Sequence, residues 1–170
     1  MKKKTKKIAV LGVLTAVALV LSYLEAILPP IYAAVPGVKV GLPNVVVILI
    51  LYRFGVKEAA MVSFMRVFIV ALLFGNAMTL AYSIAGAVLS LILLMIFKKL
   101  DWFSAVGVSI IGGIAHNVGQ IIVAILLLNS TLIAYYMIIL TITGTLAGVA
   151  VGLAGSLLIK RLEKISIEIR

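Results

Sequence analysis

Of the chain's 170 residues, 65% are hydrophobic and 12% are charged, the net charge is +10, and cysteine is absent. A soluble domain is about half apolar and a quarter charged, so the composition excludes a soluble enzyme and predicts one all-α, polytopic membrane domain over residues 1–170. The absence of cysteine excludes disulfides, thiolate catalysis and Cys-based metal sites, and without a basic face interleaved with aromatic residues the positive charge does not indicate nucleic-acid binding.

The first predicted element is a basic segment, residues 1–7, followed by an apolar helix over 8–28 that ends at Pro29-Pro30. Lysines before an apolar stretch are also typical of a secretory signal peptide. The apolar run of about 21 residues is long enough to span a bilayer, and the bulky sequence from Ser22 to Ala26 is not a small-x-small cleavage site. The sequence therefore favours a retained first helix, which proline ends because its ring clashes with the preceding turn.

Five further helices are predicted after this one. Pro36-Gly37 indicates a turn before the second helix, and Gly75-Asn76 indicates a turn before the fourth. The predicted helices cover about residues 43–54, 57–74, 77–97, 103–128 and 132–159, and a charged tail follows over 160–170. The second helix is short, so it crosses the membrane only if it is tilted or buried among the others. The chain length thus admits six spans of roughly 20 residues each, with very short loops.

The distribution of basic residues predicts the orientation of these helices. With the N-terminus inside, 13 of the 15 Lys and Arg residues lie on the cytoplasmic side, Lys39 lies outside, and Arg66 lies within a helix. Positively charged loops remain in the cytoplasm, so both termini are predicted to be cytoplasmic and the loops at 29–41, 74–77 and 129–132 external. Two cytoplasmic termini require an even number of crossings. Four crossings would leave out two segments, the second helix and a neighbour.

Small residues recur at helical spacing on three of the predicted helices. Gly12 and Ala16 form such a pair on the first helix. The other two stripes are Ala77, Ala81 and Ala85 on the fourth helix and Gly144, Gly148, Gly152 and Ser156 on the sixth. Small side chains let helix backbones approach closely in lipid. Each stripe indicates either packing within the bundle or a docking face for a second membrane subunit.

Arg66 lies about nine residues into the third predicted helix, near the middle of the bilayer. A charge at this depth is costly and normally faces a cavity or a partner. Glu25 is the one acid in the predicted outer half of the chain, and it lies at a helix end. Arg66 is therefore either a structural strut that donates to carbonyls on its cytoplasmic side or part of a site for an anionic ligand.

His116, Asn117 and Gln120 place three hydrogen-bonding side chains in the middle of the fifth predicted helix. His116 and Gln120 are four residues apart and share a face, and neighbouring glycines leave space for a ligand or for another backbone. Polar groups at membrane depth must be satisfied within the protein, here by an interhelical clamp or by a bound substrate. A single histidine without cysteine or a nearby acid does not indicate a metal site.

The remaining polar groups lie near the predicted outer side: Asn44 opens the second helix, Tyr82 lies in the fourth, and Tyr135 begins the sixth. Tyrosines at this depth are commonly interfacial anchors. Their shared depth with Gln120 also outlines an outward-facing pocket, and Lys39 adds a positive charge on this side that favours phosphate or carboxylate.

The sequence lacks the groups that several kinds of catalysis need. No GxxxxGK[ST] loop is present, so this chain does not hydrolyse ATP by itself. The five acidic residues form no pair, and Asp101 is the only aspartate, whereas a prenyl diphosphate synthase needs clustered aspartates to hold magnesium on the diphosphate. No enzyme activity, cofactor or metal is therefore expected.

Six stretches occur in an ordered set that is more specific than any one of them. They are KVGLPN at 39–44, LYRFGVKEA at 51–59, Arg66, SIAG at 83–86, GVS at 107–109 and HNVGQ at 116–120. Over about residues 8–155 the chain resembles a bacterial membrane family that is labelled both heptaprenyl diphosphate synthase component I and Gx transporter. That family is similar to the substrate-binding S components of energy-coupling-factor (ECF) transporters, which capture vitamins or similar micronutrients and pair with a transmembrane T subunit and two ABC-type ATPases.

The resemblance implies a six-helix, ECF S-component-like bundle in the bacterial cell membrane. A proline that opens a short second helix and the turn at Arg53-Phe-Gly55 belong to the shared pattern. Gly12 and Ala16 stand where S components dock the T subunit, although here the stripe is a single Gly-x-x-x-Ala rather than an extended alanine run.

The implied function is capture of a small, anionic micronutrient, such as a vitamin, a flavin or a prenyl or quinone precursor. Its expected contacts are Arg66, His116, Asn117, Gln120, Asn44, Lys39, Tyr82 and Tyr135. One alternative is a non-transporting accessory membrane subunit linked to isoprenoid or quinone metabolism. A third possibility, an uncoupled channel, is disfavoured because no charged ring or hydrated stripe continues through the helices.

Overall fold

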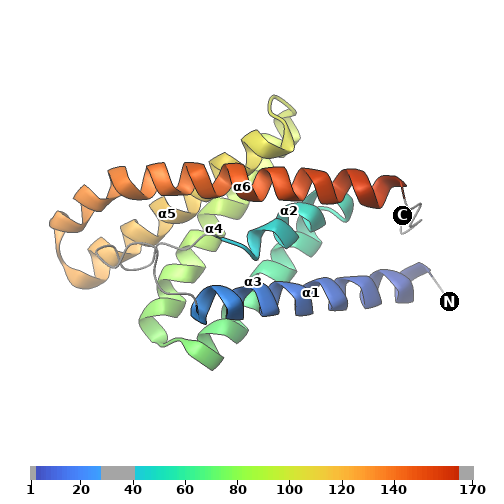
Figure 1. Cartoon of the computed structure of the whole chain (residues 1–170). Helices are drawn as coiled ribbons and strands as arrows, with labels where there is room; N and C mark the ends of the chain where they lie inside the picture. The colour runs from blue at the N-terminus through green and yellow to red at the C-terminus, as the bar shows by residue number, and fades with distance from the viewer. Residues whose placement is uncertain (1–2, 28–40, 165–170) are drawn as a thin grey trace.

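The computed structural model describes residues 3–27 and 41–164, and this part of the chain is helical without strands (Figure 1). Its elements are α1 (Lys3–Ile27), α2 (Asn44–Arg53), α3 (Val56–Phe74), α4 (Ala77–Leu100), α5 (Ala105–Leu128), the 3₁₀-helix η1 (Thr131–Tyr135) and α6 (Tyr136–Lys164). The predicted all-α class is confirmed.

Local caps explain where the helix ends differ from the prediction. α4 includes Lys98 and Lys99, because cations at a helix C-terminus interact favourably with the helix dipole, and it ends at Asp101 in the left-handed conformation. α5 begins at Ala105 rather than near residue 103, because the Ser104 side chain accepts a hydrogen bond from the backbone N–H of Gly107 as an N-cap. The sixth predicted helix begins with the 3₁₀ turn η1, a common feature at helix N-termini.

In the part of the chain that the structure describes, four helical stretches are long and apolar enough to cross a membrane: α1, α4, α5 and the stretch Thr131–Lys164. α2 has only ten residues, and the nineteen residues of α3 include three charged ones, Lys57, Glu58 and Arg66. These four spans are those of the four-crossing alternative, in which the second helix and a neighbour do not cross. Six crossings stay a prediction, and they require that protein shields α2 and the charges of α3 from lipid.

α2 is the centre of the bundle. Its residues Val46–Leu51 are all buried, and it packs against α1, α3 and α6. Ten residues of helix rise only about 15 Å, which is half of the roughly 30 Å hydrocarbon core of a bilayer. The turn from α2 into α3 passes through Gly55 with a φ of 111°, a conformation that glycine adopts without steric cost.

The glycine stripe of α6 packs within the bundle. A Cβ at Gly148 would lie 2.5 Å from the Cα of Ile110 on α5, and a Cβ at Gly113 would lie 2.6 Å from the carbonyl oxygen of Gly144. The two backbones therefore approach more closely than any side chain would allow, so of the two interpretations of this stripe the structure favours internal packing. Gly12 on α1 differs, because a Cβ there would meet nothing within 4 Å.

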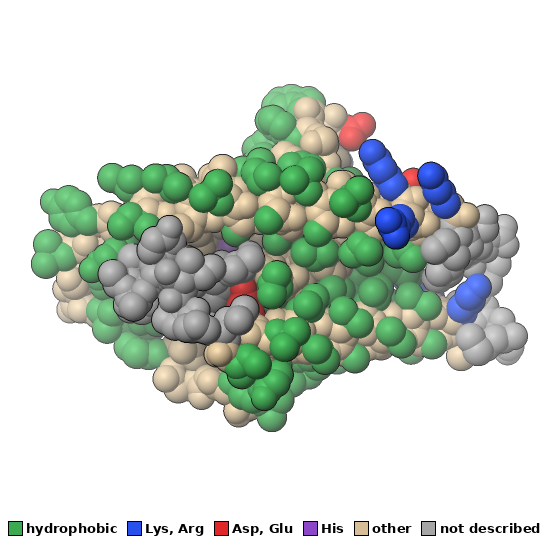
Figure 2. Space-filling view, in the orientation of Figure 1, with side chains coloured by type: hydrophobic (Ala, Val, Ile, Leu, Met, Phe, Trp, Pro, Cys, Tyr) green, Lys and Arg blue, Asp and Glu red, His purple; other side chains and the backbone are tan. Residues whose placement is uncertain are grey.

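Charged side chains tie the helices together at one end of the molecule. Lys7 of α1 pairs with Glu58 of α3 at 2.5 Å, Arg53 of α2 lies 3.8 Å from Glu163 of α6, and Lys98 of α4 donates to a carbonyl of α2. In Figure 2 the Lys and Arg side chains gather at the end where α1 begins and α6 ends, and hydrophobic side chains cover most of the visible surface elsewhere. We call this the basic end.

Candidate ligand-binding site

A cavity of about 180 Å³ lies in the middle of the bundle, with walls from all six α-helices. It is many times larger than the roughly 10–15 Å³ that one water molecule needs. Asn44 is the first residue of α2 and Arg66 the eleventh of α3, so both lie roughly 15 Å along their helices from the basic end. The cavity extends from that depth to the last turn of α1 and the turn at Gly75, which are the ends of α1 and α3 remote from the basic end.

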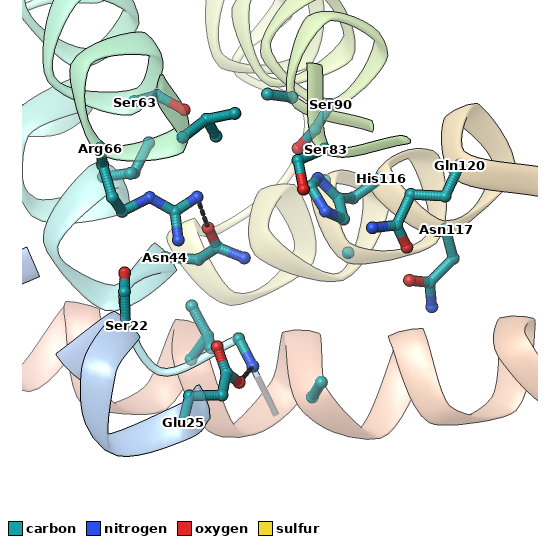
Figure 3. Close-up of a pocket in the computed structure, with 18 of the residues that line it drawn as sticks. Ser22, Glu25, Asn44, Ser63, Arg66, Ser83, Ser90, His116, Asn117 and Gln120 are labelled. Atoms are coloured by element: carbon teal, nitrogen blue, oxygen red, sulfur yellow. Dashed lines mark hydrogen bonds between the residues drawn. The ribbon is translucent and has the colours of Figure 1, made fainter. Parts of the chain in front are cut away.

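Arg66 lies on the α3 wall of the cavity and points toward Asn44 of α2 (Figure 3). One guanidinium N–H group donates to the Asn44 side-chain oxygen at 3.3 Å. The Nε atom is buried and has no hydrogen-bond partner among the residues that the structure describes. Of the two interpretations of Arg66, the strut would require donation to backbone carbonyls on the cytoplasmic side. The guanidinium group instead lines the cavity.

Glu25, from the last turns of α1, lines the same cavity. Its carboxylate accepts a hydrogen bond from the backbone N–H of Gly41, just before α2. Glu25 and Arg66 thus line one cavity, but the two residues form no ion pair within the described part of the chain. The position of Glu25 at a helix end did not indicate that this acid shares a cavity with Arg66, as it does in the structure.

His116 and Gln120 line the opposite wall, on α5 (Figure 3). The His116 ring lies against α4 at Gly86, where a Cβ would come within 2.9 Å of the imidazole. Asn117 also lines the cavity, but its side-chain N–H donates to the carbonyl oxygen of Leu140 on α6 at 2.7 Å. Asn117 therefore acts as an interhelical clamp, the alternative that the sequence left open for this cluster.

The structure brings five of the eight expected ligand contacts to one cavity: Asn44, Arg66, His116, Asn117 and Gln120. Tyr82 and Tyr135 are not among the residues that line it. The Tyr82 hydroxyl lies 3.9 Å from the sulfur of Met78, and Tyr135 is 76% exposed, as expected of an interfacial anchor. Lys39 lies outside the described residues. The role of each residue as a ligand contact stays a prediction.

The serine hydroxyl groups around the cavity were not among the contacts predicted from the sequence. Ser22 and Ser63 line the cavity three residues before Glu25 and Arg66, on the same helix faces as these charges. Thr79, Ser83 and Ser90 line it from α4. Their spacings of four and seven residues form one polar stripe on an otherwise apolar helix. That periodicity is visible in the sequence and could have predicted that this face of α4 lines the cavity.

The cavity can bind a small polar molecule through charge and hydrogen bonds. Arg66 offers forked donors suited to a carboxylate or phosphate, and the Gln120 amide on α5 offers neutral hydrogen bonds. Within the described residues, no group of three or more His, Asp or Glu side chains could hold a metal ion.

Fold and site together define a polytopic helical membrane protein with a polar internal cavity. The model of one protein family matches residues 14–158, most of the chain. The chain belongs to this family, heptaprenyl diphosphate synthase component I. The name describes one component of a synthase and so implies a partner subunit. No curated protein and no solved structure matches the chain in the corresponding comparisons.

Proposed function

We propose that this protein is the membrane-embedded substrate-binding component of an ECF-type transporter and that it captures a small compound with an acidic group. The observation that carries the proposal is the buried Arg66 Nε, which has no hydrogen-bond partner among the described residues and lies at a cavity that polar and apolar side chains both line. A buried donor without a hydrogen bond is costly, and an acidic ligand group would satisfy it. The basic end is then cytoplasmic, and the ligand enters from the opposite side of the cell membrane.

The outer surface of α1 supports docking of a transmembrane T subunit. Gly12 and Ala16 are both exposed, and the space beside Gly12 is open. A partner helix could therefore approach the α1 backbone closely at this point. The T subunit would in turn connect the protein to ATPases, since this chain has no phosphate-binding loop of its own.

The family name favours a second candidate, an accessory subunit without catalytic activity that supports a prenyl diphosphate synthase. A prenyl diphosphate is also anionic and would suit Arg66. The two candidates differ in their partners, because an ECF component assembles with a T subunit and ATPases, whereas the accessory subunit assembles with a soluble synthase subunit.

One purification tests both parts of the proposal. The protein is extracted from its native membrane in mild detergent, its partners are identified, and native mass spectrometry detects any retained small molecule. We expect a T subunit and ATPases with the wild type, their loss in Gly12→Leu, and a retained acidic compound that is absent from Arg66→Ala. Co-purification of a synthase subunit alone would favour the second candidate, and retention of the compound by Arg66→Ala would contradict the binding site.

A further inference from the structure

Two opposite charges share the cavity without pairing directly. Arg66 lies on α3 and Glu25 on α1, with the start of α2 between them (Figure 3). Each is held by a neutral partner instead: Arg66 by the Asn44 side chain and Glu25 by the backbone N–H of Gly41. The segment from Gly41 to Asn44 thus binds the anion and the cation through two separate hydrogen bonds at the same cavity.

Both groups retain hydrogen-bonding capacity. A guanidinium has five N–H donors, and Arg66 directs one of its terminal groups at Asn44 while Nε has no partner. A carboxylate has about four acceptor positions, and Glu25 uses one for Gly41. Within the described part of the chain, the site therefore offers unused donors at Arg66 and unused acceptor positions at Glu25.

The charges also determine which ligand the cavity tolerates. Among the described residues that line it, the Lys, Arg, Asp and Glu side chains are Arg66, which is positive, and Glu25, which is negative, so these two formal charges balance. A ligand that is only anionic would leave a net negative charge in a low-dielectric interior and would be repelled by Glu25. A ligand with both charges would leave the filled cavity neutral.

From this arrangement we infer that the ligand is zwitterionic: its acidic group binds Arg66, and a basic group of the same molecule binds Glu25. This inference rests on the proposed function and narrows its ligand class. The uncharged polar part of the ligand then faces His116 and Gln120 on the opposite wall (Figure 3).

A matched set of probes tests the inference. The probes are common α-amino acids and ω-amino acids, which vary the separation of the two charges, and the N-acetyl form of each, which keeps the carboxylate and removes the positive charge. Thermal unfolding of the full-length protein in detergent identifies the free amino acid that stabilises it most, and titration gives its dissociation constant. We expect the N-acetyl form to bind about ten- to a hundredfold more weakly, the loss typical of a charge-assisted hydrogen bond.

The variant Glu25→Gln gives opposite results for the two ligand classes. Its amide oxygen can still accept from Gly41, so the fold is retained, which unfolding without probe verifies. For a zwitterion, Glu25→Gln weakens binding about ten- to a hundredfold, whereas for a simple anion it strengthens binding by removing repulsion. Glu58→Gln is the matched control: it removes an acid that pairs with Lys7 at the basic end, and it should leave the affinity unchanged.

Three results would overturn the inference: N-acetyl probes that bind the wild type as tightly as free amino acids, tighter binding in Glu25→Gln, or no stabilisation by any free amino acid. If N-acetyl probes bind and Arg66→Gln abolishes their binding, the zwitterion fails while the proposed binding function stands. If no probe binds and no acidic compound is retained on purification, both fail.

Discussion

Arg66 combines a high cost of burial with a single hydrogen bond, to a neutral side chain, within the described residues. A charge-assisted hydrogen bond is worth about 1.5–3 kcal/mol, and a neutral one about 0.5–1.5 kcal/mol. We therefore expect Arg66→Ala to weaken binding of the retained compound about ten- to a hundredfold, Arg66→Lys to weaken it less, and Gln120→Ala to have the smallest effect. Isothermal titration of the compound against each purified variant measures this order.

Tyr135→Phe is the control for this series, because the exposed Tyr135 does not line the cavity. Its affinity should equal that of the wild type. An unchanged affinity in Arg66→Ala would show that the guanidinium does not contact the compound.

At the scale of single residues, the sequence predicted the polar groups that are costly to bury in any membrane helix, whatever the fold. Arg66 and the cluster at His116 are conspicuous because any membrane helix must satisfy them. The position of Glu25 depends instead on how α1 packs beside Gly41, which no local pattern contains. Tyr82 does not line the cavity. Its depth along the helix was visible in the sequence, but depth does not specify the direction in which a side chain points around the helix axis.

At the scale of elements, the close packing of α6 against α5 depends on the glycines of α6. In Gly148→Ala the new Cβ would lie 2.5 Å from the Ile110 backbone, so α5 and α6 must separate. Overpacking of this kind costs about 1–3 kcal/mol, and we expect a clearly lower unfolding temperature in detergent.

Gly12→Ala is the matched change on a free helix surface. Nothing lies within 4 Å of the new Cβ, and alanine is a better helix former than glycine by about 1 kcal/mol. Its unfolding temperature should be equal to or above that of the wild type. Equal destabilisation by both substitutions would contradict the packing described for α5 and α6.

The spacing of small residues predicted that another helix could approach these helices closely, but it did not predict which helix does so. The stripes on α1 and α6 follow the same rule in sequence, yet one is open and the other meets a backbone. The order of helices along the chain does not distinguish the two stripes, because whether a stripe is covered depends on which face its helix turns toward the bundle. The ends of α4 and α5, in contrast, follow from local chemistry at Asp101 and Ser104.

For the whole molecule, the charges at the basic end predict membrane orientation. Lys57, Lys99 and Asn76 are exposed, and the chain has no natural cysteine. We expect Asn76→Cys to react with a membrane-impermeant thiol reagent added to intact cells, and Lys57→Cys and Lys99→Cys to react only after permeabilisation. Reaction of either lysine position from outside, with protection of position 76, would reverse the orientation and place the cavity mouth toward the cytoplasm.

The burial of α2 has a consequence for how the protein is made. α2 precedes α6 in the chain, but part of its surroundings comes from α6. A Cβ at Gly155 of α6 would meet the Ile48 side chain, and Arg53 lies 3.8 Å from Glu163 of α6. Residues 144–151 of α6 also contribute to a wall of the cavity. Because ten residues are too few to cross a bilayer unaided, α2 is fully surrounded by protein only after α6 has entered the membrane. The binding site is therefore complete only after α6 has been translated and inserted, and a nascent chain that ends before α6 lacks one wall of it.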